Sequence, residues 1–301
     1  MKKTLAILLS ALLCLSLFAA CGEEPAGESD VPSEEPSATE PAESEEPVEE
    51  PAEEISGNVT LNGSTSMESV ILALIEGFAE VQPDVNPQYT GSGSGAGIEG
   101  VLGGTCDLGL ASRALSDEEK AQGAVENIIA LDGVAVVINP ENTVTDLTTE
   151  QIAAIFKGEI TNWSEVGGPD GAIAVFGREA GSGTRGAFEE ILGIEDACAY
   201  TNEYSSTGDV IGNVASNPNA IGYASLSAVN DSVVAVAVNG VTPSEETVAD
   251  GSFAIQRPFV VVTVEGTELS PAAQAFLDYA MSADVADIIT AAGAVPASLA
   301  K

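Results

Sequence analysis

The sequence predicts an α/β protein whose sheets are largely parallel. After residue 56, short runs rich in β-branched and apolar residues alternate with stretches whose apolar residues recur about every 3.6 positions. Three loops rich in Gly, Ser and Thr lie where an expected strand leads into an expected helix. Ligands of open α/β sheets bind beyond the carboxyl ends of the strands, so we expect a binding site where these loops gather.

The expected strands and helices follow from the apolar runs and from the 3.6-residue spacing, respectively. The longest apolar run, 128–138, predicts a buried strand, and 66–81 has the apolar spacing of an amphipathic helix. The expected strands are 59–61, 88–90, 107–110, 128–138, 172–176, 220–224, 233–238 and 259–264. The expected helices are 66–81, 97–102, 151–156, 186–192, 210–216 and 271–281.

The first 21 residues have the pattern of an export signal. Lys2 and Lys3 precede an apolar run over 5–18 that is too short for a membrane span. Two alanines then precede Cys21, which resembles a bacterial lipobox in which the cysteine is diacylated, although Phe18 stands where Leu is usual. We therefore expect lipidation at Cys21; the alternative is an ordinary cleaved signal with an incidental cysteine.

Residues 22–55 are expected to form an acidic, Pro/Glu-rich disordered linker. The run 22–54 holds 14 of the 47 acidic residues and six of the 15 prolines, with very few aliphatic side chains. Such a composition buries too little apolar surface to offset the entropy of ordering. The linker is interpreted as a tether between the lipid anchor and the folded region.

The folded region is strongly acidic. Residues 56–301 keep 33 of the 47 acidic residues and seven of the nine Lys and Arg, a formal charge near −26. No basic patch offsets this charge, which argues against nucleic-acid binding. An anion site in such a protein has to depend on short-range hydrogen bonds rather than on long-range attraction.

The absence of histidine from the sequence excludes several kinds of chemistry. It removes catalysis by Ser-His-Asp or Cys-His pairs and most zinc sites, and we expect no cofactor or metal. Cys14 lies in the signal, which leaves Cys106 and Cys198 in the folded region. A disulfide between them is one interpretation; two small buried hydrophobic residues is the favoured one.

The three loops lie at 63–66, 91–97 and 181–184, and each resembles an anion site at a helix start. Unpaired amide groups and the positive end of the helix dipole hold phosphate-sized anions, and hydroxyls add neutral donors. An N-cap explains 63–66 equally well. The loop 91–97 resembles a phosphate-cradling nest but lacks the lysine of a nucleotide-binding P-loop.

The third loop follows an arginine, which makes it the most specific signal. The Arg178 guanidinium presents a planar fork of donors suited to two oxyanion oxygens, and Ser182, Gly183 and Thr184 follow at a helix start. The alternative is a surface ion pair between Arg178 and Glu179. Arg185 lies one residue further into the helix and is expected to face an acidic neighbour.

Taken in order and with their spacing, these motifs resemble the phosphate-specific periplasmic-type binding proteins, the solute-binding subunits of phosphate ABC transporters. The likeness covers nearly all of 56–301. The segments that carry it are 63–66, 89–95, 107–113, 132–137, 147–152, 156–163, 178–184 and 219–223.

The resemblance implies a two-lobed periplasmic-binding-protein type II fold with a two-strand hinge. Residues 56–135 and 258–301 would form one lobe and 136–257 the other, with crossings near Val136 and Arg257-Pro258. The implied phosphate ligands are Thr65, Ser66, Ser94, Arg178, Ser182, Gly183 and Thr184, to which we add Gly181 of the same loop. Relatives carry an aspartate near Ser112 and another near Ala180, so we expect Ser112 and Arg113 to contribute here instead.

The resemblance also implies a function. The chain would be a monomeric, non-enzymatic protein on the outer face of a Gram-positive-type membrane, delivering inorganic phosphate to the permease and ATPase subunits of an ABC importer. Without the usual aspartates, sulfate, molybdate or tungstate remains an alternative ligand. A serine hydrolase or phosphatase that uses Ser94 or Ser182 is a further alternative, disfavoured because neither serine has an evident base.

Overall fold

The computed structural model describes residues 55–300, whose strands and helices pack around several hydrophobic cores. The expected signal, the lipidation site Cys21 and the acidic run 22–54 lie outside the described residues. Within 55–300, no helix is long and apolar enough to cross a membrane.

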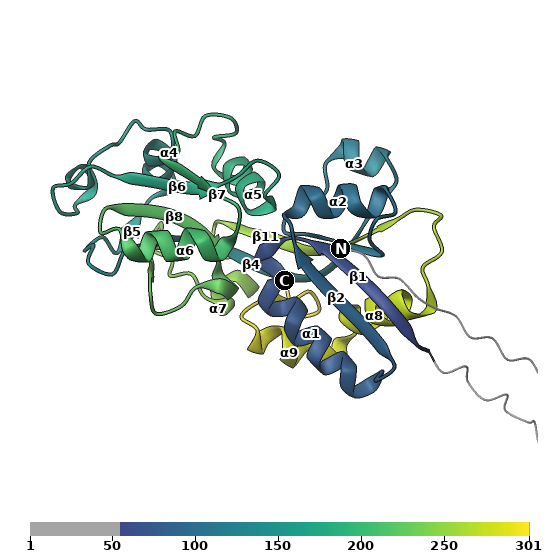
Figure 1. The fold of residues 1–301 in the computed structure, drawn as a ribbon. Coiled ribbons are helices and arrows are strands. Elements are labelled where there is room, and N and C mark those ends of the chain that lie inside the picture. Colours follow the sequence, from purple (N-terminus) through teal and green to yellow (C-terminus); the bar gives the residue numbers. More distant parts are fainter. Residues whose placement is uncertain (1–54, 301) are drawn as a thin grey trace, which may run out of the picture. The chain divides into compact units, whose positions relative to one another are not determined.

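The strands form one ten-stranded sheet and a small two-stranded one, and the main path runs β2-β1-β3-β11-β4-β8-β6-β7 (Figure 1). The strands are β1 (Gly57–Gly63), β2 (Val85–Gly91), β3 (Leu108–Ala111), β4 (Ala124–Ile138), β5 (Asp146–Leu147), β6 (Ala174–Arg178), β7 (Asn202–Tyr204), β8 (Ala220–Ser225), β9 (Val234–Ala235), β10 (Ala237–Val238), β11 (Gln256–Val264) and β12 (Val295–Pro296). Pairs at the two ends of this path are parallel, and every antiparallel pair involves β4 or β11. The expected α/β class is confirmed, and the strand pairing is mixed, with five parallel and five antiparallel strand pairs within 55–300.

Strands β4 and β11 form the antiparallel ribbon at the centre of the path. β11 pairs with the first part of β4, from Ala124 to Gly133, with a bulge between Phe259 and Val260. The last part of β4 pairs instead with β8. The expected lobe boundaries near Val136 and Arg257-Pro258 fall within these two strands, and they stay a prediction.

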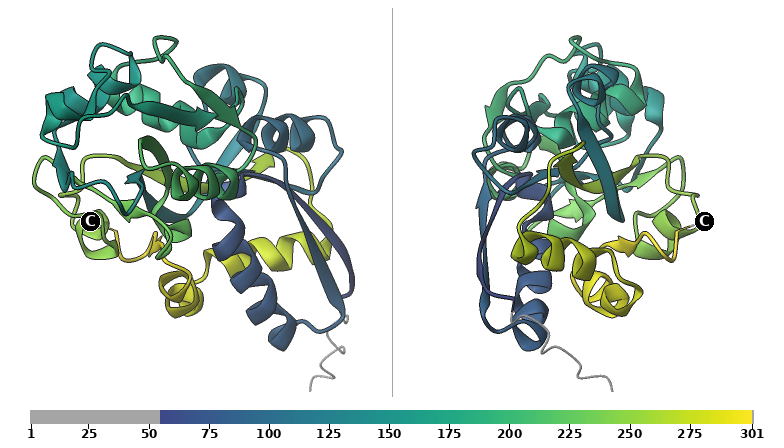
Figure 2. Two further views of the ribbon diagram at one scale, coloured as in Figure 1. Left: turned by 60° about the vertical axis from the view of Figure 1, so that its left-hand side comes forward. Right: turned by 90° about the vertical axis from the view of Figure 1, so that its right-hand side faces the viewer.

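Nine α-helices and four 3₁₀ turns flank the strands in the described residues. The helices are α1 (Glu68–Val81), α2 (Ser94–Leu102), α3 (Asp117–Ala121), α4 (Thr149–Phe156), α5 (Gly183–Leu192), α6 (Thr207–Ser216), α7 (Glu245–Ala249), α8 (Pro271–Met281) and α9 (Ala286–Ala291). The 3₁₀ turns are η1 (Thr65–Met67), η2 (Trp163–Val166), η3 (Leu226–Ala228) and η4 (Ala283–Val285). Figure 2 shows α8 and α9 lying next to α1.

Two large hydrophobic cores account for the packing. The first joins β1 and α1 with the C-terminal helix α8, where the rings of Phe78 and Phe276 meet edge to face at 5.2 Å. The second surrounds Trp163 and Tyr223, and there Phe188 stacks on the Tyr223 ring at 4.2 Å. Such ring pairs add about 0.5–1.5 kcal/mol beyond area burial. The C-terminal segment therefore completes the core that the N-terminal segment begins.

The two cysteines of the folded region differ from the favoured expectation. Cys106 and Cys198 are both free thiols, so they are not paired with each other, and both are only partly buried. Each sulfur lies near a backbone carbonyl oxygen, that of Gly97 for Cys106 and that of Ile194 for Cys198. Burial raises the pKa of the Cys198 thiol to about 11, which keeps it protonated at neutral pH.

A buried ion pair links the two strands of the central ribbon. The Arg257 guanidinium, on β11, donates through Nε and Nη2 to Asp132 Oδ2, on β4, at 3.1 and 2.9 Å. Both side chains are almost completely buried. Arg257 Nη1 also donates to the backbone carbonyl of Ser112, at 3.0 Å, so the pair holds the end of β3 in place as well.

We predict that Asp132→Asn destabilises the fold severely, because it leaves the Arg257 charge buried without a partner. Removing one member of a buried pair costs about 3–5 kcal/mol, which urea denaturation followed by circular dichroism will measure. The matched control is Glu159→Gln, which removes the carboxylate of an exposed pair with Lys157. That change is expected to cost less than about 1 kcal/mol. Equal losses in the two variants would contradict the structural role of Asp132.

Candidate functional site

Four helices begin close together, and their first residues build the site. A side-chain cap opens two of them: Ser182 accepts from the Arg185 amide at α5, and Ser206 from the Asp209 amide at α6. Ser64 accepts from the Ser66 amide and so caps the 3₁₀ turn η1, which leads directly into α1. The fourth helix, α2, begins after Gly93, whose φ of 92° favours glycine. Several first-turn amides donate to these caps or to neighbouring loops, but those of Gly183 and Thr184 at α5 have no hydrogen bond with other described residues and are available to a ligand.

The side chains at these four helix starts, together with one after β3, form a group that we call the hydroxyl cluster. The cluster consists of Ser64, Thr65, Ser66, Ser94, Ser112, Thr184 and Thr207. In one part of it, Ser64 Oγ donates to Ser112 Oγ at 2.8 Å, and Ser112 Oγ lies 3.3 Å from Ser94 Oγ. The Ser112 amide also donates to Ser94 Oγ, at 3.1 Å. These three side chains are buried, so their hydroxyls are fixed by one another.

The other part of the hydroxyl cluster joins segments that are more than 100 residues apart in the sequence. Ser66 Oγ lies 2.5 Å from Thr184 Oγ1 and 3.1 Å from Thr207 Oγ1. Thr65 Oγ1 accepts from the Thr207 amide and lies 3.3 Å from Thr207 Oγ1. The starts of α1, α5 and α6 therefore meet through hydroxyl groups.

Gly183 brings the two parts of the hydroxyl cluster together. A Cβ atom at this position would lie 2.2 Å from Ser94 Oγ and 2.8 Å from Ser112 Oγ. Both distances are shorter than the van der Waals contact distance between non-bonded atoms. Beside it, the Gly95 amide donates to the Gly181 carbonyl at 2.9 Å. Only glycine permits α5 to begin this close to the α2 start.

Arg178, at the end of β6, lies against the hydroxyl cluster and is 2% exposed. Its Nη1 donates to Thr207 Oγ1 at 3.1 Å, and its Nε and Nη2 donate to the backbone carbonyls of Tyr204 and Ser205. No carboxylate among the described residues forms an ion pair with Arg178. The surface pair with Glu179, which was the alternative interpretation, is therefore absent from 55–300.

Burial lowers the pKa of the Arg178 guanidinium from its ordinary value, because desolvation disfavours the charged form. The buried charge of Arg257 lowers this pKa further, whereas the carboxylates of Glu179 and Asp209, which form no ion pair with Arg178, raise it in part. An arginine still remains charged at neutral pH. Arg178 is thus a buried cation whose partners are neutral oxygen atoms.

A buried polar network holds the backbone of Arg178. The Arg178 amide donates to the Tyr223 hydroxyl at 3.0 Å, and Arg185 Nη1 donates to the Arg178 carbonyl at 3.1 Å. The Tyr223 hydroxyl lies 3.1 Å from that of Tyr200, which donates to Glu189 at 2.8 Å. This network fixes the guanidinium, since it holds the strand end from which Arg178 projects.

Arg185 pairs with acidic neighbours, as expected. Its Nε lies 2.8 Å from Glu189 Oε1, its Nη1 contacts Glu203, and its guanidinium lies 5.0 Å from the centroid of the Tyr200 ring. The prediction that Arg185 faces acidic side chains is confirmed.

The structure brings most of the predicted ligand residues together and leaves three aside. The Ser182 hydroxyl caps α5 and forms no hydrogen bond with the hydroxyl cluster within 55–300. Arg113 forms a two-pronged pair with Glu119, at 2.7 and 2.8 Å, and its stem lies close to Gly186 of α5. Gly181 is exposed, with a φ of +85°. Neither Arg113 nor Gly181 forms a hydrogen bond with a residue of the hydroxyl cluster within 55–300. The phosphate roles of Arg113, Gly181 and Ser182 stay predictions.

Sequence reasoning missed two members of the hydroxyl cluster as site residues. Ser64 lies inside the first Gly/Ser/Thr loop, but the motif alone does not predict a contact of its side chain with the site. Thr207 belongs to a fourth such stretch, Ser-Ser-Thr-Gly at 205–208, which opens α6. A helix start rich in hydroxyls is the signal that would have found Thr207.

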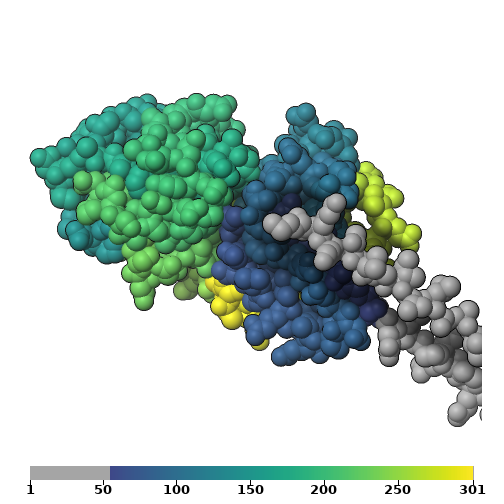
Figure 3. Space-filling view, viewed as in Figure 1, coloured from purple at the N-terminus to yellow at the C-terminus, as the bar shows by residue number. Residues whose placement is uncertain are grey.

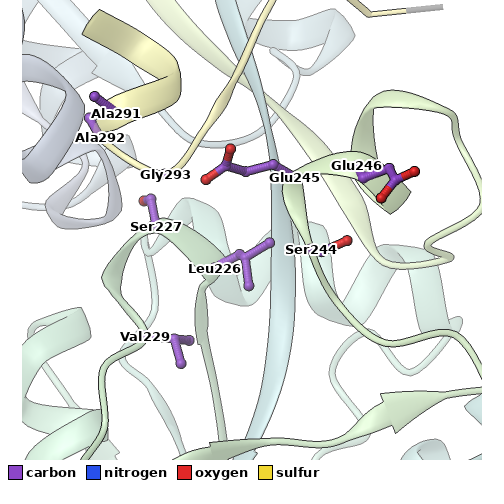
Figure 4. A pocket seen from close by; sticks show the side chains of 9 residues that line it. All are labelled: Leu226, Ser227, Val229, Ser244, Glu245, Glu246, Ala291, Ala292 and Gly293. Carbon is purple, nitrogen blue, oxygen red and sulfur yellow. The ribbon is translucent and has the colours of Figure 1, made fainter. Parts of the chain in front are cut away.

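The described residues hold no cluster of three or more Cys, Asp or Glu side chains that could bind a metal ion. A separate cavity of about 540 Å³ lies between η3 and α9. Figure 4 shows the Glu245 carboxylate reaching toward Ser227 and Gly293 inside it, while Glu246 points away. A carboxylate in this position makes the cavity unsuitable for an oxyanion, whereas the hydroxyl cluster with Arg178 is suited to one.

Comparisons with known proteins bear directly on this geometry. The model of the PBP superfamily domain matches residues 47–284. Phosphate-binding protein PstS of Bacillus subtilis is 34% identical over 245 residues, which cover 78% of this chain and 79% of that protein.

The chain is also similar to solved structures of phosphate-binding proteins. A phosphate ABC transporter substrate-binding protein from Clostridium perfringens, crystallised with bound phosphate, is 40% identical and aligns with a TM-score of 0.77 over 80% of this chain and 99% of its own. An ABC-type phosphate transport receptor from Vibrio cholerae is 31% identical, with a TM-score of 0.67 over 80% and 100% of the two chains. The chain therefore has the two-lobed fold of these proteins and belongs to the PBP superfamily, within the family of the phosphate-binding proteins PstS.

Proposed function

We propose that the chain binds inorganic phosphate at Arg178 and the hydroxyl cluster and delivers it to an ABC-type importer. The observation that carries this proposal is the burial of Arg178 without a carboxylate partner. A buried charge is costly unless it is paired, and an anion is the partner that this position lacks. The names of the relatives, which are phosphate-binding proteins, support phosphate as that anion.

The proposed binding mode is a dense set of short-range donors. The Arg178 guanidinium provides charge-assisted hydrogen bonds, and the amides at the start of α5 and the hydroxyls of Ser66, Ser94 and Thr184 add neutral ones. Each hydroxyl can donate or accept, so the cluster can also accept the proton of a monohydrogen phosphate. This mode suits a protein with a formal charge of −38, in which long-range attraction of an anion is absent.

Sulfate remains an alternative ligand to phosphate because of the composition of the hydroxyl cluster. The hydroxyl cluster contains no carboxylate, the group that would accept a phosphate proton and repel an unprotonated sulfate. Selection between phosphate and sulfate therefore falls to hydroxyl lone pairs, which discriminate less strongly than a charge. A hydrolase is disfavoured, because the chain has no histidine and the Ser94 and Ser182 hydroxyls accept hydrogen bonds from backbone amides.

Titration calorimetry on residues 53–301 with phosphate tests the proposal, and a second titration follows in excess sulfate. We expect one phosphate per chain and only a modest loss of apparent affinity in sulfate. Complete displacement by sulfate would identify the alternative oxyanion as the ligand, and absence of heat with phosphate would contradict the proposed function. A chromogenic phosphate ester added to the same sample should remain unhydrolysed.

We further propose that the protein is a monomer held by lipid chains at Cys21 on the extracellular face of the membrane, where it meets the permease and ATPase subunits of the importer. The supporting pattern is the charged start, the short apolar run and the Ala-Ala-Cys sequence. Cys21→Ala should release the protein from the membrane fraction of expressing cells into the medium, and immunoblots of the two fractions will show it. Retention of the variant on the membrane would contradict the lipid anchor.

A further inference from the structure

Two buried side chains of the hydroxyl cluster, Ser94 and Ser112, have one proton more than they can donate to each other. Ser112 Oγ accepts from Ser64 Oγ at 2.8 Å, and Ser94 Oγ accepts from the Ser112 amide at 3.1 Å. Each hydroxyl still has its own proton to donate, and the two oxygens lie 3.3 Å apart, so one of the protons can bridge them. The other proton has no acceptor within 55–300 and is available to an anion.

The position of Ser112 is set by a side chain 145 residues away in the sequence. The pairing of β3 with β11 ends at Ala111, opposite Val260, so Ser112 lies just beyond this ladder. The Arg257 guanidinium reaches Ser112 instead, and its Nη1 donates to the Ser112 carbonyl at 3.0 Å. A long side chain of β11 therefore continues, toward the site, the contact that the strand pairing begins.

The Arg257 guanidinium is itself fixed by Asp132. Its Nε and Nη2 donate to Asp132 Oδ2 at 3.1 and 2.9 Å, and its central carbon lies 5.5 Å from the centroid of the Phe259 ring. Because a guanidinium is rigid and planar, the two bonds to Asp132 also set the direction of Nη1, which donates to Ser112. Arg257 is 3% exposed and Asp132 is 1% exposed, so water has little access to these bonds.

The hydroxyl cluster lies where separate parts of the chain meet. In Figure 3 the purple surface of the N-terminal segments abuts the green surface of the segments around α6. Ser66 and Thr207 come from these two parts, and their hydroxyl oxygens lie 3.1 Å apart. Ser112 and Arg257, by contrast, are both buried. The Asp132–Arg257 pair thus supports the site from the interior of the protein.

We propose that Arg257, aligned by Asp132, is a positioning residue of the anion site. It holds Ser112 where the available proton of the Ser94–Ser112 hydroxyl pair is directed to the anion. The inference rests on the proposed phosphate site, because that proton needs an anion to accept it. The two buried arginines then have different roles: Arg178 contacts the anion, whereas Arg257 acts through Ser112 and orients a neutral donor.

The test replaces both members of the buried pair, by Asp132→Leu combined with Arg257→Met. A buried pair exchanged for apolar residues of similar size often leaves stability unchanged or raised, so the fold is retained, and circular dichroism checks it. The net charge of the protein also stays the same. We expect the affinity for inorganic phosphate in titration calorimetry to fall by about tenfold or more, the effect of one misaligned hydrogen bond to a charged ligand. An affinity equal to that of the wild type would overturn the inference.

A double-mutant cycle tests whether the pair acts through the serines. Ser94→Ala combined with Ser112→Ala removes the two hydroxyls, and the replacement of Asp132 and Arg257 is then added to that variant. The effects of residues that act through one another are not additive, so we expect the added replacement to change the phosphate affinity less than about twofold. A further tenfold loss would show that the pair acts by another route and would overturn the inference.

A destabilised control separates positioning from stability. Phe276→Leu creates a cavity in the first core, where Phe276 is fully buried against Phe78. This variant should unfold at lower temperature and bind phosphate with the affinity of the wild type. A loss of affinity equal to that of the Asp132/Arg257 variant would show that affinity only follows stability, which would overturn the inference and leave the proposed function intact. Absence of phosphate binding by the wild type would overturn both.

Discussion

The site is organised around the buried charge of Arg178, which the described residues do not neutralise. Backbone carbonyls and one threonine hydroxyl satisfy its hydrogen bonds, but they supply no opposite charge. The other buried arginine shows the contrast, because Arg257 is paired with Asp132. Desolvation makes a buried unpaired cation unfavourable by several kcal/mol. The hydroxyl cluster and the close packing of Gly183 against Ser94 place neutral donors around this cation. The hydrogen bonds of Tyr223 hold the backbone of Arg178, so the cation stays where an anion can bind it.

The chemistry of the hydroxyl cluster explains how so acidic a protein can bind an anion. The charge of the whole chain opposes phosphate at long range, but screening limits that effect to roughly 8–10 Å at ordinary ionic strength. Hydroxyls and helix-start amides act at contact distance, in a buried site where salt screens them little. They also come from four helix starts contributed by distant parts of the chain, so the site depends on the whole fold rather than on one loop.

Much of this could be predicted from the sequence, because strong local patterns lie behind it. The long strand β4, the amphipathic helix α1 and the loop after Arg178 each carry their signal within a few residues. The roles of Thr207 and Arg257 could not be found in this way. Thr207 meets Thr65 and Ser66 across more than 140 residues, and Arg257 is matched to Asp132 across 125. The five-residue helices α3 and α7 are too short to show a periodicity, although each begins with a serine cap.

Thermal unfolding of residues 53–301 with and without phosphate, in the wild type and in Arg178→Met, tests the central claim most directly. Phosphate should stabilise the wild type by about 2.7 kcal/mol at a hundredfold excess over Kd, and should not stabilise the variant. Without phosphate, the variant should be at least as stable as the wild type, because methionine replaces an uncompensated buried charge. Equal stabilisation of both proteins by phosphate, or a variant much less stable without it, would show that Arg178 is not the charge that phosphate neutralises.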